Sequence, residues 1–506
     1  MTPFPPFEPD RSIHYDGSSA NVLNMRPVAD GYGPLYTLVS FSSALASAPR
    51  GSIAVRTAKG VQAAFVGTAT ALYKLKSDGT WEDVSSGVYA LPSGDEWSFD
   101  LFGERVIATN IADGAFYFDI GSSTDFVVLP GSPPKAKYVS VVGDFVWLLN
   151  LDSAPADYAF SGLNNSEIWT IGEQFSDVGT FPDGGEIMGC VPTVGGCFIL
   201  QRRMIRAASF APSSGFTFTI SIANEKTGCV APRSIAKIGP GDFVFLAQDG
   251  FYRGVTATPI GAERVDRTFK NLIAGSALEA VSAAADPDEK LIYFRFQKTD
   301  GTSLFYLYDW QLDRWSQSDQ NVSGISLMVT SSLTLDDLDI LFPDGIDSAG
   351  ITVDSKEFSG GRPSVAGFTS DWKIGYFTGE TLACEAETAT VELNAPQRSF
   401  VRSAQIIGDV SVSGPGSYDN IDTPVDDLTG SSDEYYEEQF TVTLGTADYH
   451  SQSITWGDAS SPNYYTGIVP FRSSARLHRA KININAGTDW NHVIGIRFDA
   501  IGEGNR

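Results

Sequence analysis

The feature that most constrains the fold of this chain is a pair of short apolar runs that recurs every 39–53 residues. Each copy has an apolar run, a polar turn and a second run rich in aromatic residues. The copies begin at Phe65, Val106, Phe145, Phe198, Phe243, Leu291 and, in a weaker seventh copy, Leu338. Repeats of about 40–50 residues, each with roughly four short strands, are typical of β-propeller blades. The period therefore predicts six or seven blades.

Turn-forming residues separate the apolar runs throughout, since the chain has 50 Gly and 26 Pro. No long amphipathic helix is expected, and the best candidate for a helix runs from Asn271 to Ala284. We therefore predict an all-β protein, a six- or seven-bladed β-propeller with an additional C-terminal antiparallel β domain. A string of unrelated β-hairpins in two sandwiches stays open as the alternative, because the repeats share a pattern but no sequence motif.

Changes in periodicity divide the chain into three parts. Residues 1–50 are expected to form an N-terminal extended arm and first strands, residues 51–362 the β-propeller, and residues 363–506 the C-terminal β domain. Within the last part, residues 408–438 are polar and acidic and predict an exposed loop. Six of its acidic residues are candidates for a functional tip or gate: Asp426, Asp427, Asp433, Glu434, Glu437 and Glu438.

Composition excludes several classes of function. With 35 basic and 61 acidic residues the formal charge is −26, which opposes tight, non-specific binding to nucleic acid. The first ten residues lack the basic and apolar regions of a signal peptide, and no window reaches the roughly 18 apolar residues of a membrane span. The sequence therefore predicts neither classical export nor a membrane anchor.

Residues that commonly carry chemistry are few and scattered. The four cysteines, Cys190, Cys197, Cys229 and Cys384, have no zinc-ligand spacing and are expected to be small buried residues. A disulfide between Cys190 and Cys197 is the alternative. The four histidines are isolated, and motifs of serine hydrolases, nucleotide hydrolases and dinucleotide enzymes are missing. Asp286-Pro-Asp288-Glu289 predicts a turn before the strand at Leu291 rather than a calcium loop. We predict no catalytic residue, no cofactor and no metal site, and hence no enzyme.

The order of several short segments resembles a known family. The segments are Asn24-Met-Arg-Pro27, Gly31-Tyr-Gly-Pro34, Arg50-Gly51, Phe65-Val-Gly-Thr68, Leu72-Tyr73, Trp81-Glu-Asp-Val84, Gly195–Leu200, Met204-Ile-Arg206, Gly228, Ala231-Pro-Arg-Ser234, Phe245–Tyr252, Leu307-Tyr-Asp-Trp310, Arg314-Trp-Ser316 and Arg476-Leu-His-Arg479. Together they resemble the tailed-phage structural proteins of the packaged-DNA stabilization or tail-nozzle type, best over residues 20–320. The collinear order carries this resemblance, since no single motif is diagnostic.

The resemblance implies a viral structural protein of the bacteriophage virion, made in the host cytoplasm and placed in the tail. Such a protein forms a homo-hexameric ring below the head–tail adaptor (connector), retains packaged double-stranded DNA without binding it tightly and lets it exit at ejection. Tail fibre, spike or needle proteins are further expected partners. The acidic residues of the 408–438 loop would form a nozzle tip or gate, and the insertion between Leu149 and Ile168 is a candidate for subunit contacts.

Two other functions remain as alternatives. Aromatic residues of the kind that stack on sugars, among them Trp456 and the pairs Tyr435-Tyr436 and Tyr464-Tyr465, are compatible with a tail-associated propeller that binds a receptor or glycan. A glycoside hydrolase would need two carboxylates that face each other across a cleft. Sequence spacing in a β-rich chain cannot reveal such a pair.

Overall fold

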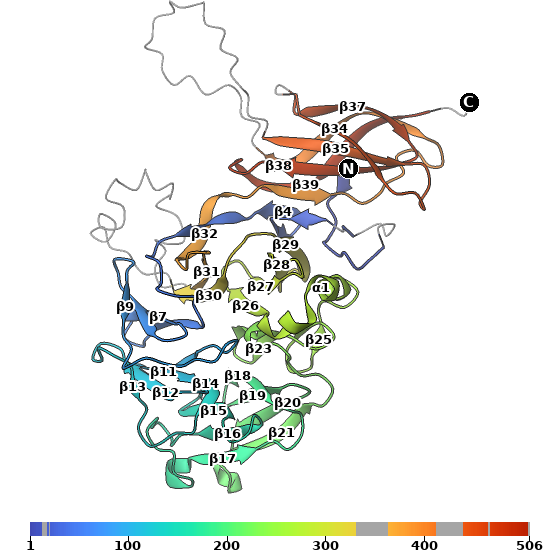
Figure 1. Ribbon diagram of the computed structural model, residues 1–506. Helices are drawn as coiled ribbons and strands as arrows, with labels where there is room; N and C mark the ends of the chain where they lie inside the picture. Colours follow the sequence, from blue (N-terminus) through green and yellow to red (C-terminus); the bar gives the residue numbers. More distant parts are fainter. Residues whose placement is uncertain (13–17, 20, 330–362, 411–438, 464–465, 504–506) are drawn as a thin grey trace, which may run out of the picture.

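The computed structural model describes residues 1–12, 18–19, 21–329, 363–410, 439–463 and 466–503. These residues form a β-propeller, below in Figure 1, and a two-sheet β-sandwich above it. The predicted all-β class, with a propeller and an additional C-terminal antiparallel β domain, is confirmed. Within the described residues, no helix is long and apolar enough to cross a membrane.

Seven blades of four antiparallel strands form the propeller in the described part of the chain; six are separate four-stranded sheets, and blade 6 is part of a nine-stranded sheet. Blades 1 to 3 are β6 (Ser52–Arg56), β7 (Gln62–Gly67), β8 (Leu72–Leu75) and β9 (Trp81–Asp83); β10 (Ser98–Phe102), β11 (Arg105–Asn110), β12 (Gly114–Asp119) and β13 (Val127–Val128); and β14 (Ala136–Val142), β15 (Phe145–Leu151), β16 (Asp157–Phe160) and β17 (Asp177–Thr180). Blades 4 to 6 are β18 (Ile187–Thr193), β19 (Gly196–Gln201), β20 (Ile205–Phe210) and β21 (Phe218–Asn224); β22 (Ala236–Gly239), β23 (Asp242–Leu246), β24 (Phe251–Arg253) and β25 (Thr258–Pro259); and β26 (Ser282–Asp286), β27 (Leu291–Gln297), β28 (Ser303–Asp309) and β29 (Arg314–Ser318).

Adjacent blades pack face to face, which explains why the second strand of a blade is continuously apolar. Between blades 1 and 2, Phe65 of β7 packs against Phe118 of β12, with ring centroids 5.0 Å apart. Between blades 3 and 4, Trp147 of β15 packs against Phe218 of β21 at 4.9 Å. A strand buried on both faces shows no alternation of apolar and polar residues.

Blade 7 combines one strand from near the N-terminus with three strands from much later in the chain. It consists of β30 (Gly324–Val329), β31 (Pro363–Phe368), β32 (Ile374–Thr381) and β5 (Tyr36–Ser40). Because β30 lies against β6 of blade 1, this blade closes the ring. The boundary expected at 362/363 thus falls inside blade 7, and the propeller extends to Thr381. The weak seventh sequence copy at Leu338 lies outside the described residues.

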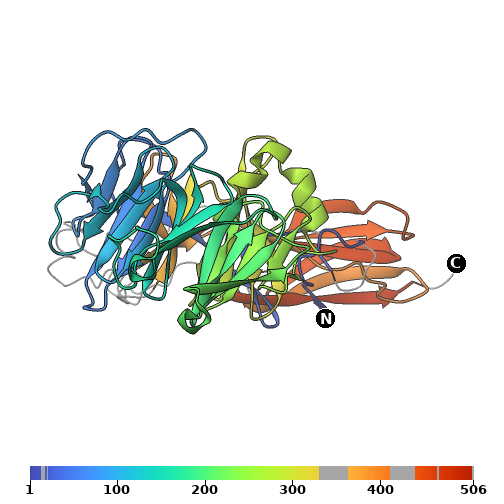
Figure 2. The ribbon, with the colours of Figure 1, turned by 90° about the horizontal axis from the view of Figure 1, so that it is seen from below.

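Strands from both ends of the chain also form the sandwich. One sheet has the order β3 (Met25–Val28), β4 (Gly31–Pro34), β39 (Trp490–Gly502), β34 (Ser399–Val410) and β37 (Ile468–Ala475), with β1 (Thr2–Pro3) also on β39. The other includes β2 (Val22–Leu23), β33 (Cys384–Glu387), β38 (Leu477–Ile484), β35 (Phe440–Ala447) and β36 (Thr455–Ser460). Residues 1–34 are therefore part of the sandwich, and the two ends of the chain lie there in both ribbon views (Figures 1 and 2).

Propeller and sandwich share one sheet and one core. Leu23 of β2 pairs with Gln317 of blade 6 on one side and with Glu385 of β33 on the other, so the blade 6 sheet runs on into the sandwich. A single cluster of buried residues includes Phe251 of blade 5, Trp315 of blade 6 and Trp490 of the sandwich. The shared sheet and core hold the two parts as one unit.

The helix expected from Asn271 to Ala284 is wrong in position and length. The structure has α1 (Asp266–Leu272) and the 3-10 helix η4 (Gly275–Ala280), and β26 begins at Ser282. Alanines 283–285, which favour helix locally, instead pair with β27 as the inner strand of blade 6. Tertiary pairing overrides helix propensity there.

Candidate functional site

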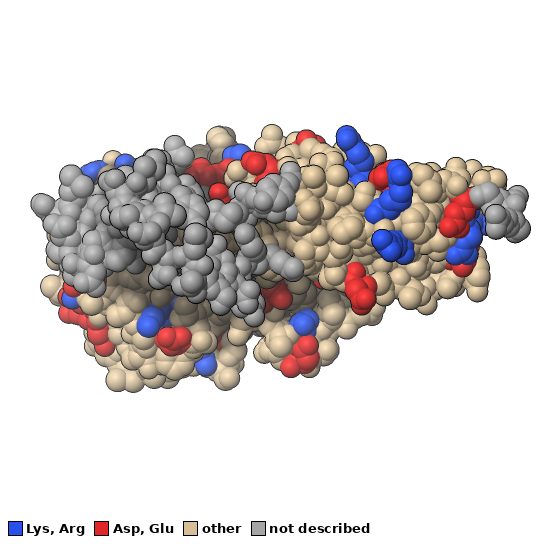
Figure 3. Space-filling view, turned by 90° about the horizontal axis from the view of Figure 1, so that it is seen from above, with Lys and Arg blue, Asp and Glu red and all other residues tan. Residues whose placement is uncertain are grey.

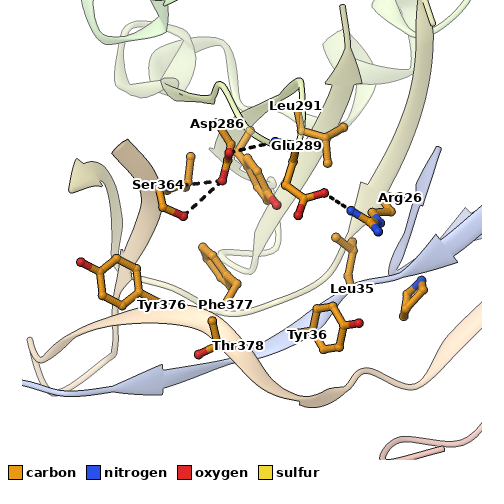
Figure 4. Close-up of a pocket in the computed structure, with 13 residues that line it drawn as sticks. Arg26, Leu35, Tyr36, Asp286, Glu289, Leu291, Ser364, Tyr376, Phe377 and Thr378 are labelled. Atoms are coloured by element: carbon orange, nitrogen blue, oxygen red, sulfur yellow. Dashed lines mark hydrogen bonds and ion pairs between the residues drawn. The ribbon is translucent and has the colours of Figure 1, made fainter. Parts of the chain in front are cut away.

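A cavity of about 290 Å³ lies where blades 6 and 7 meet the N-terminal strands (Figure 4). Tyr36 of β5 and Tyr376 and Phe377 of β32 supply aromatic lining, and Arg26, Asp286 and Glu289 supply charged groups. Its volume lies at the lower end of the range for small-molecule sites, roughly 300–1,000 Å³. The cavity is thus assembled from three stretches of chain that are distant in sequence, residues 26–36, 286–293 and 364–378.

Asp286 holds the turn at the base of this cavity. It ends β26 and is buried, and its carboxylate accepts the backbone N–H groups of Asp288 at 3.0 Å and Glu289 at 3.1 Å. The Ser364 hydroxyl of β31 donates to the same carboxylate at 3.3 Å. The predicted turn before Leu291 is confirmed. Because these donors occupy its oxygens, the main role of Asp286 is structural: it links blade 6 to blade 7.

The remaining charges in the cavity are balanced. Arg26 of β3 forms an ion pair with Glu289, and both side chains are half-buried. Burial, followed by the nearby charge of Asp286, raises the pKa of the Tyr293 hydroxyl well above its usual value. The Tyr293 ring is stacked on Phe377, with centroids 5.7 Å apart. Aromatic faces beside paired charges can hold a small polar ligand but provide no nucleophile with an adjacent base.

A second polar cluster lies at the end of the propeller axis where the inner strands begin. Glu96, just before β10 of blade 2, forms an ion pair with Arg233, just before β22 of blade 5. Blades 3 and 4 lie between these two blades on one side of the ring and blades 6, 7 and 1 on the other, so the pair spans the axis. Lys137 and Asp95 join blades 3 and 2 at 3.2 Å on the same side. The axis is therefore crossed by side chains at this end.

Asp266 forms a third feature, in a depression of about 870 Å³ beside α1. Its buried carboxylate accepts the N–H of Phe251 at 3.2 Å and lies against Gly261, where an added Cβ would come within 2.0 Å of it. Burial raises the pKa of Asp266 to about 7. Asp10 of the N-terminal arm accepts the N–H groups of Arg267 and Thr268, both at 2.7 Å, and so caps α1.

The structure leaves the sequence-predicted acidic residues untested. Asp426, Asp427, Asp433, Glu434, Glu437 and Glu438 all lie outside the described residues. The expected loop begins at Gly408, but residues 408–410 are still part of β34. All four cysteines are buried and free, as predicted. In the described ranges, no three His, Cys, Asp or Glu side chains gather as metal ligands do.

The cavity at Asp286 was not predicted from the sequence. The turn at Asp286 and the Arg26 segment were both visible in the sequence, but nothing local indicates that residues 26, 36, 286 and 377 meet. The ion pair of Glu96 and Arg233 is equally hidden, because it depends on where the inner strands of two distant blades begin.

Comparisons with known proteins place the chain in no family. No protein-family model matches it, and no curated protein matches it. Among solved structures, it is similar to the extracellular domain of the B. thetaiotaomicron hybrid two-component system BT4673, with 9% identity and a TM-score of 0.38 over 74% of this chain and 43% of that one. It is also similar to virginiamycin B lyase from Staphylococcus aureus, with 10% identity and a TM-score of 0.34 over 57% of this chain and 89% of the lyase. Kluyveromyces lactis Hsv2p has 9% identity and a TM-score of 0.31 over 52% of this chain and 75% of Hsv2p.

The chain thus spans less than half of the bacterial extracellular domain. At these identities and TM-scores, none of the three indicates a function.

Proposed function

We propose that the protein is a structural subunit of a short-tailed phage virion, a nozzle that extends the DNA channel below the head–tail adaptor. Six copies would form a ring that retains packaged double-stranded DNA and lets it exit at infection, with no catalytic step. The observation that carries this proposal is the collinear order of family-like segments between Asn24 and Ser316.

The segments of the resemblance lie at positions that hold the fold together. Phe245–Tyr252 spans the β23–β24 hairpin, Leu307-Tyr-Asp-Trp310 with Arg314-Trp-Ser316 spans the β28–β29 hairpin, and Arg476–Arg479 opens β38. The first segment, Asn24–Pro27, lies where the N-terminal strands join the sandwich. These segments form hairpins and strand ends rather than a reactive site, and this is compatible with a structural subunit.

The propeller axis constrains where DNA would run. Because Glu96 and Arg233 meet across that axis, a duplex could not pass through a single propeller. In the proposed ring, the conduit therefore lies between copies. A formal charge of −26 per chain suits such a conduit, since each phosphate that a wall neutralises would add salt-dependent affinity and slow the passage of DNA.

Single-particle imaging of the virion that contains this protein, averaged with and without imposed symmetry, tests the proposal. Six copies around an axial channel below the adaptor are expected. Copies in trimeric appendages at the tail periphery would contradict a nozzle and favour receptor binding.

A second candidate function rests on the cavity at Asp286. Its aromatic residues, Tyr36, Tyr376 and Phe377, beside the Arg26–Glu289 pair, suit a small sugar unit of a receptor or glycan. Glycan arrays probed with the wild-type protein and Tyr36→Ala test this function. Glycan binding by the wild-type protein that is lost in Tyr36→Ala would support this function. If the wild-type protein binds no glycan on the array, the function is ruled out. A glycoside hydrolase would in addition turn over a bound polysaccharide, and Glu289→Gln would abolish that turnover.

A further inference from the structure

The outer face of one sandwich sheet carries exposed arginines in an otherwise acidic protein. Arg402 of β34, Arg472 of β37 and Arg497 of β39 are exposed, whereas Val401, Val469 and Ile496 on the same strands are buried in the core. Figure 3 looks down on the molecule from the side of the sandwich and shows several Lys and Arg side chains there, with Asp and Glu side chains beside them. We call Arg402, Arg472 and Arg497 the arginine face.

A β-bulge places Arg402 in this group. The register of β34 shifts between Val401 and Ser403 against both neighbouring strands, so that Arg402 lies opposite Phe471 and Arg472 of β37. Bulges of this kind reorient a side chain and recur at functional positions. Arg402 and Arg472 consequently border one depression of about 590 Å³, together with Phe400, Pro470 and Phe471.

Among the residues that the structure describes, the charges of this face are not balanced. Arg402 contacts Asp499 at 2.7 Å, and both side chains are about half exposed. Within the described residues, no carboxylate forms an ion pair with Arg472 or Arg497. Three arginines against one aspartate leave a local excess of two positive charges, in a chain whose formal charge is −26.

We propose that the arginine face is a subunit contact that receives carboxylate side chains from a second copy of this chain. Charge complementarity indicates this occupant, because a second copy has 61 acidic residues against 35 basic ones. Arginine binds carboxylates through paired N–H donors, and arginine beside aromatic residues is enriched at the energetic centres of interfaces. Net repulsion between copies does not prevent the contact, since salt screens charges beyond about 8 Å.

The inference rests on the proposed ring, and it supplies one of the two unlike faces that ring closure requires. It assigns the arginine face to the contact in place of the blade 3 insertion expected from the sequence. The insertion between Leu149 and Ile168 contains β16, and it stays a candidate for the opposite side of the contact. The loop from 161 to 176 overlaps its end and also exposes Ile171 and Phe175.

The test is self-association of the purified full chain, measured by sedimentation velocity over a range of protein and salt concentrations. The variant Arg472→Glu/Arg497→Glu breaks no ion pair within the described residues, so its fold should persist, and circular dichroism checks this. Arg56→Glu/Arg203→Glu is the matched control, because it makes the same charge change at exposed arginines of the propeller. We expect at least about tenfold weaker self-association and a shallower salt dependence for the first variant only.

Three results would overturn the proposal. The first is an equal loss of self-association in both variants, and the second is no loss in either. The third is a wild-type protein that stays monomeric at about 100 μM protein in roughly 0.15 M salt, where the net repulsion between copies is screened. Titration with duplex DNA adds a fourth: if the arginine variant loses DNA affinity but associates normally, the face binds phosphate instead. Imaging separates this inference from the nozzle itself, since a sixfold ring whose neighbours leave the arginine face uncovered would refute only the contact.

Discussion

Arg233 of blade 5 and Glu96 of blade 2 form an ion pair across the propeller axis, and Arg295 of blade 6 lies within their electrostatic reach. Burial, and then Arg233, lower the pKa of Arg295, whereas Glu96 raises it. Glu96 is thus the carboxylate that offsets two arginines at the end of the axis.

This arrangement predicts that substituting Glu96 lowers the free energy of unfolding more than substituting Arg233 does. Glu96→Gln should lower the free energy of unfolding by about 1–2 kcal/mol, because it leaves Arg233 and Arg295 to repel each other. Arg233→Met should cost less than about 1 kcal/mol, since it also removes that repulsion. Urea unfolding of both variants and the double variant measures the difference, and equal costs would show that Arg295 is uncoupled from the pair.

Asp266 should make the protein less stable as pH rises. Its pKa is raised to about 7 by burial, so the folded state keeps a proton that the unfolded chain releases above about pH 4. The resulting loss of stability grows as pH rises from about 4 and is complete above 7. Asp266→Asn should therefore be more stable than wild type at pH 8 by about 2 kcal/mol, with the gain fading towards pH 4. Asp249→Asn, in the same depression, is the control. A pH-independent difference for Asp266→Asn would contradict this account.

His478 should have the opposite effect on the pH dependence. It is fully buried within hydrogen-bonding distance, 2.9 Å, of the Ser399 hydroxyl, and burial lowers its pKa. The unfolded chain therefore binds a proton more readily, and the contribution of neutral His478 is lost as pH falls below about 6.5. His478→Gln should cost about 1 kcal/mol at pH 7.5 and lose less stability than wild type between pH 7.5 and 5. Parallel curves for wild type and variant would refute this role, and exposed His450→Gln serves as reference.

Glu387 should be among the most sensitive charged positions of the sandwich. It pairs with Arg479 at 3.0 Å, and the two side chains are only 10% and 6% exposed. Glu387→Gln would leave a buried guanidinium without its carboxylate, at a cost of about 3–5 kcal/mol. Glu392→Gln, whose carboxylate lies 3.8 Å from Arg476 and is more exposed, should cost less than about 1 kcal/mol. Chemical denaturation measures both losses of unfolding free energy. Similar losses would mean that burial does not determine how much these ion pairs contribute to stability.

Closure of blade 7 depends on a close approach at Gly375 of β32. An added Cβ there would lie 2.1 Å from the carbonyl oxygen of Val39 in β5, so Gly375→Ala should displace β5 and cost about 1–3 kcal/mol. Gly239→Ala, which has no atom within 4 Å of the added Cβ, is the control. Hydrogen exchange should rise in residues 36–40 and 374–377. Unchanged protection there would show that β5 is not strained by the substitution.

Local pattern was sufficient to predict the blades but not their closure. Phe65, Val106, Phe145, Phe198, Phe243 and Leu291 lie in the second strands of blades 1 to 6, where both faces are buried and the apolar run is continuous. Strands β2 and β5 left no such signal, because each is short and pairs with residues more than 290 positions away. The cavity at Asp286 was hidden for the same reason, since it forms only when β5 and β32 meet blade 6.

The pairing of early strands with late ones also sets the order in which a newly made chain can fold. Blades 1 to 6 are complete within residues 52–318, so they can form during synthesis. Tyr36–Ser40 can pair only after β32 has been synthesised. Thr2–Pro3 can pair only after Gly495 and Ile496 have left the ribosome. Until then these N-terminal strands present unpaired backbone and apolar side chains, which makes the first 40 residues the part of the nascent chain most in need of protection from premature association.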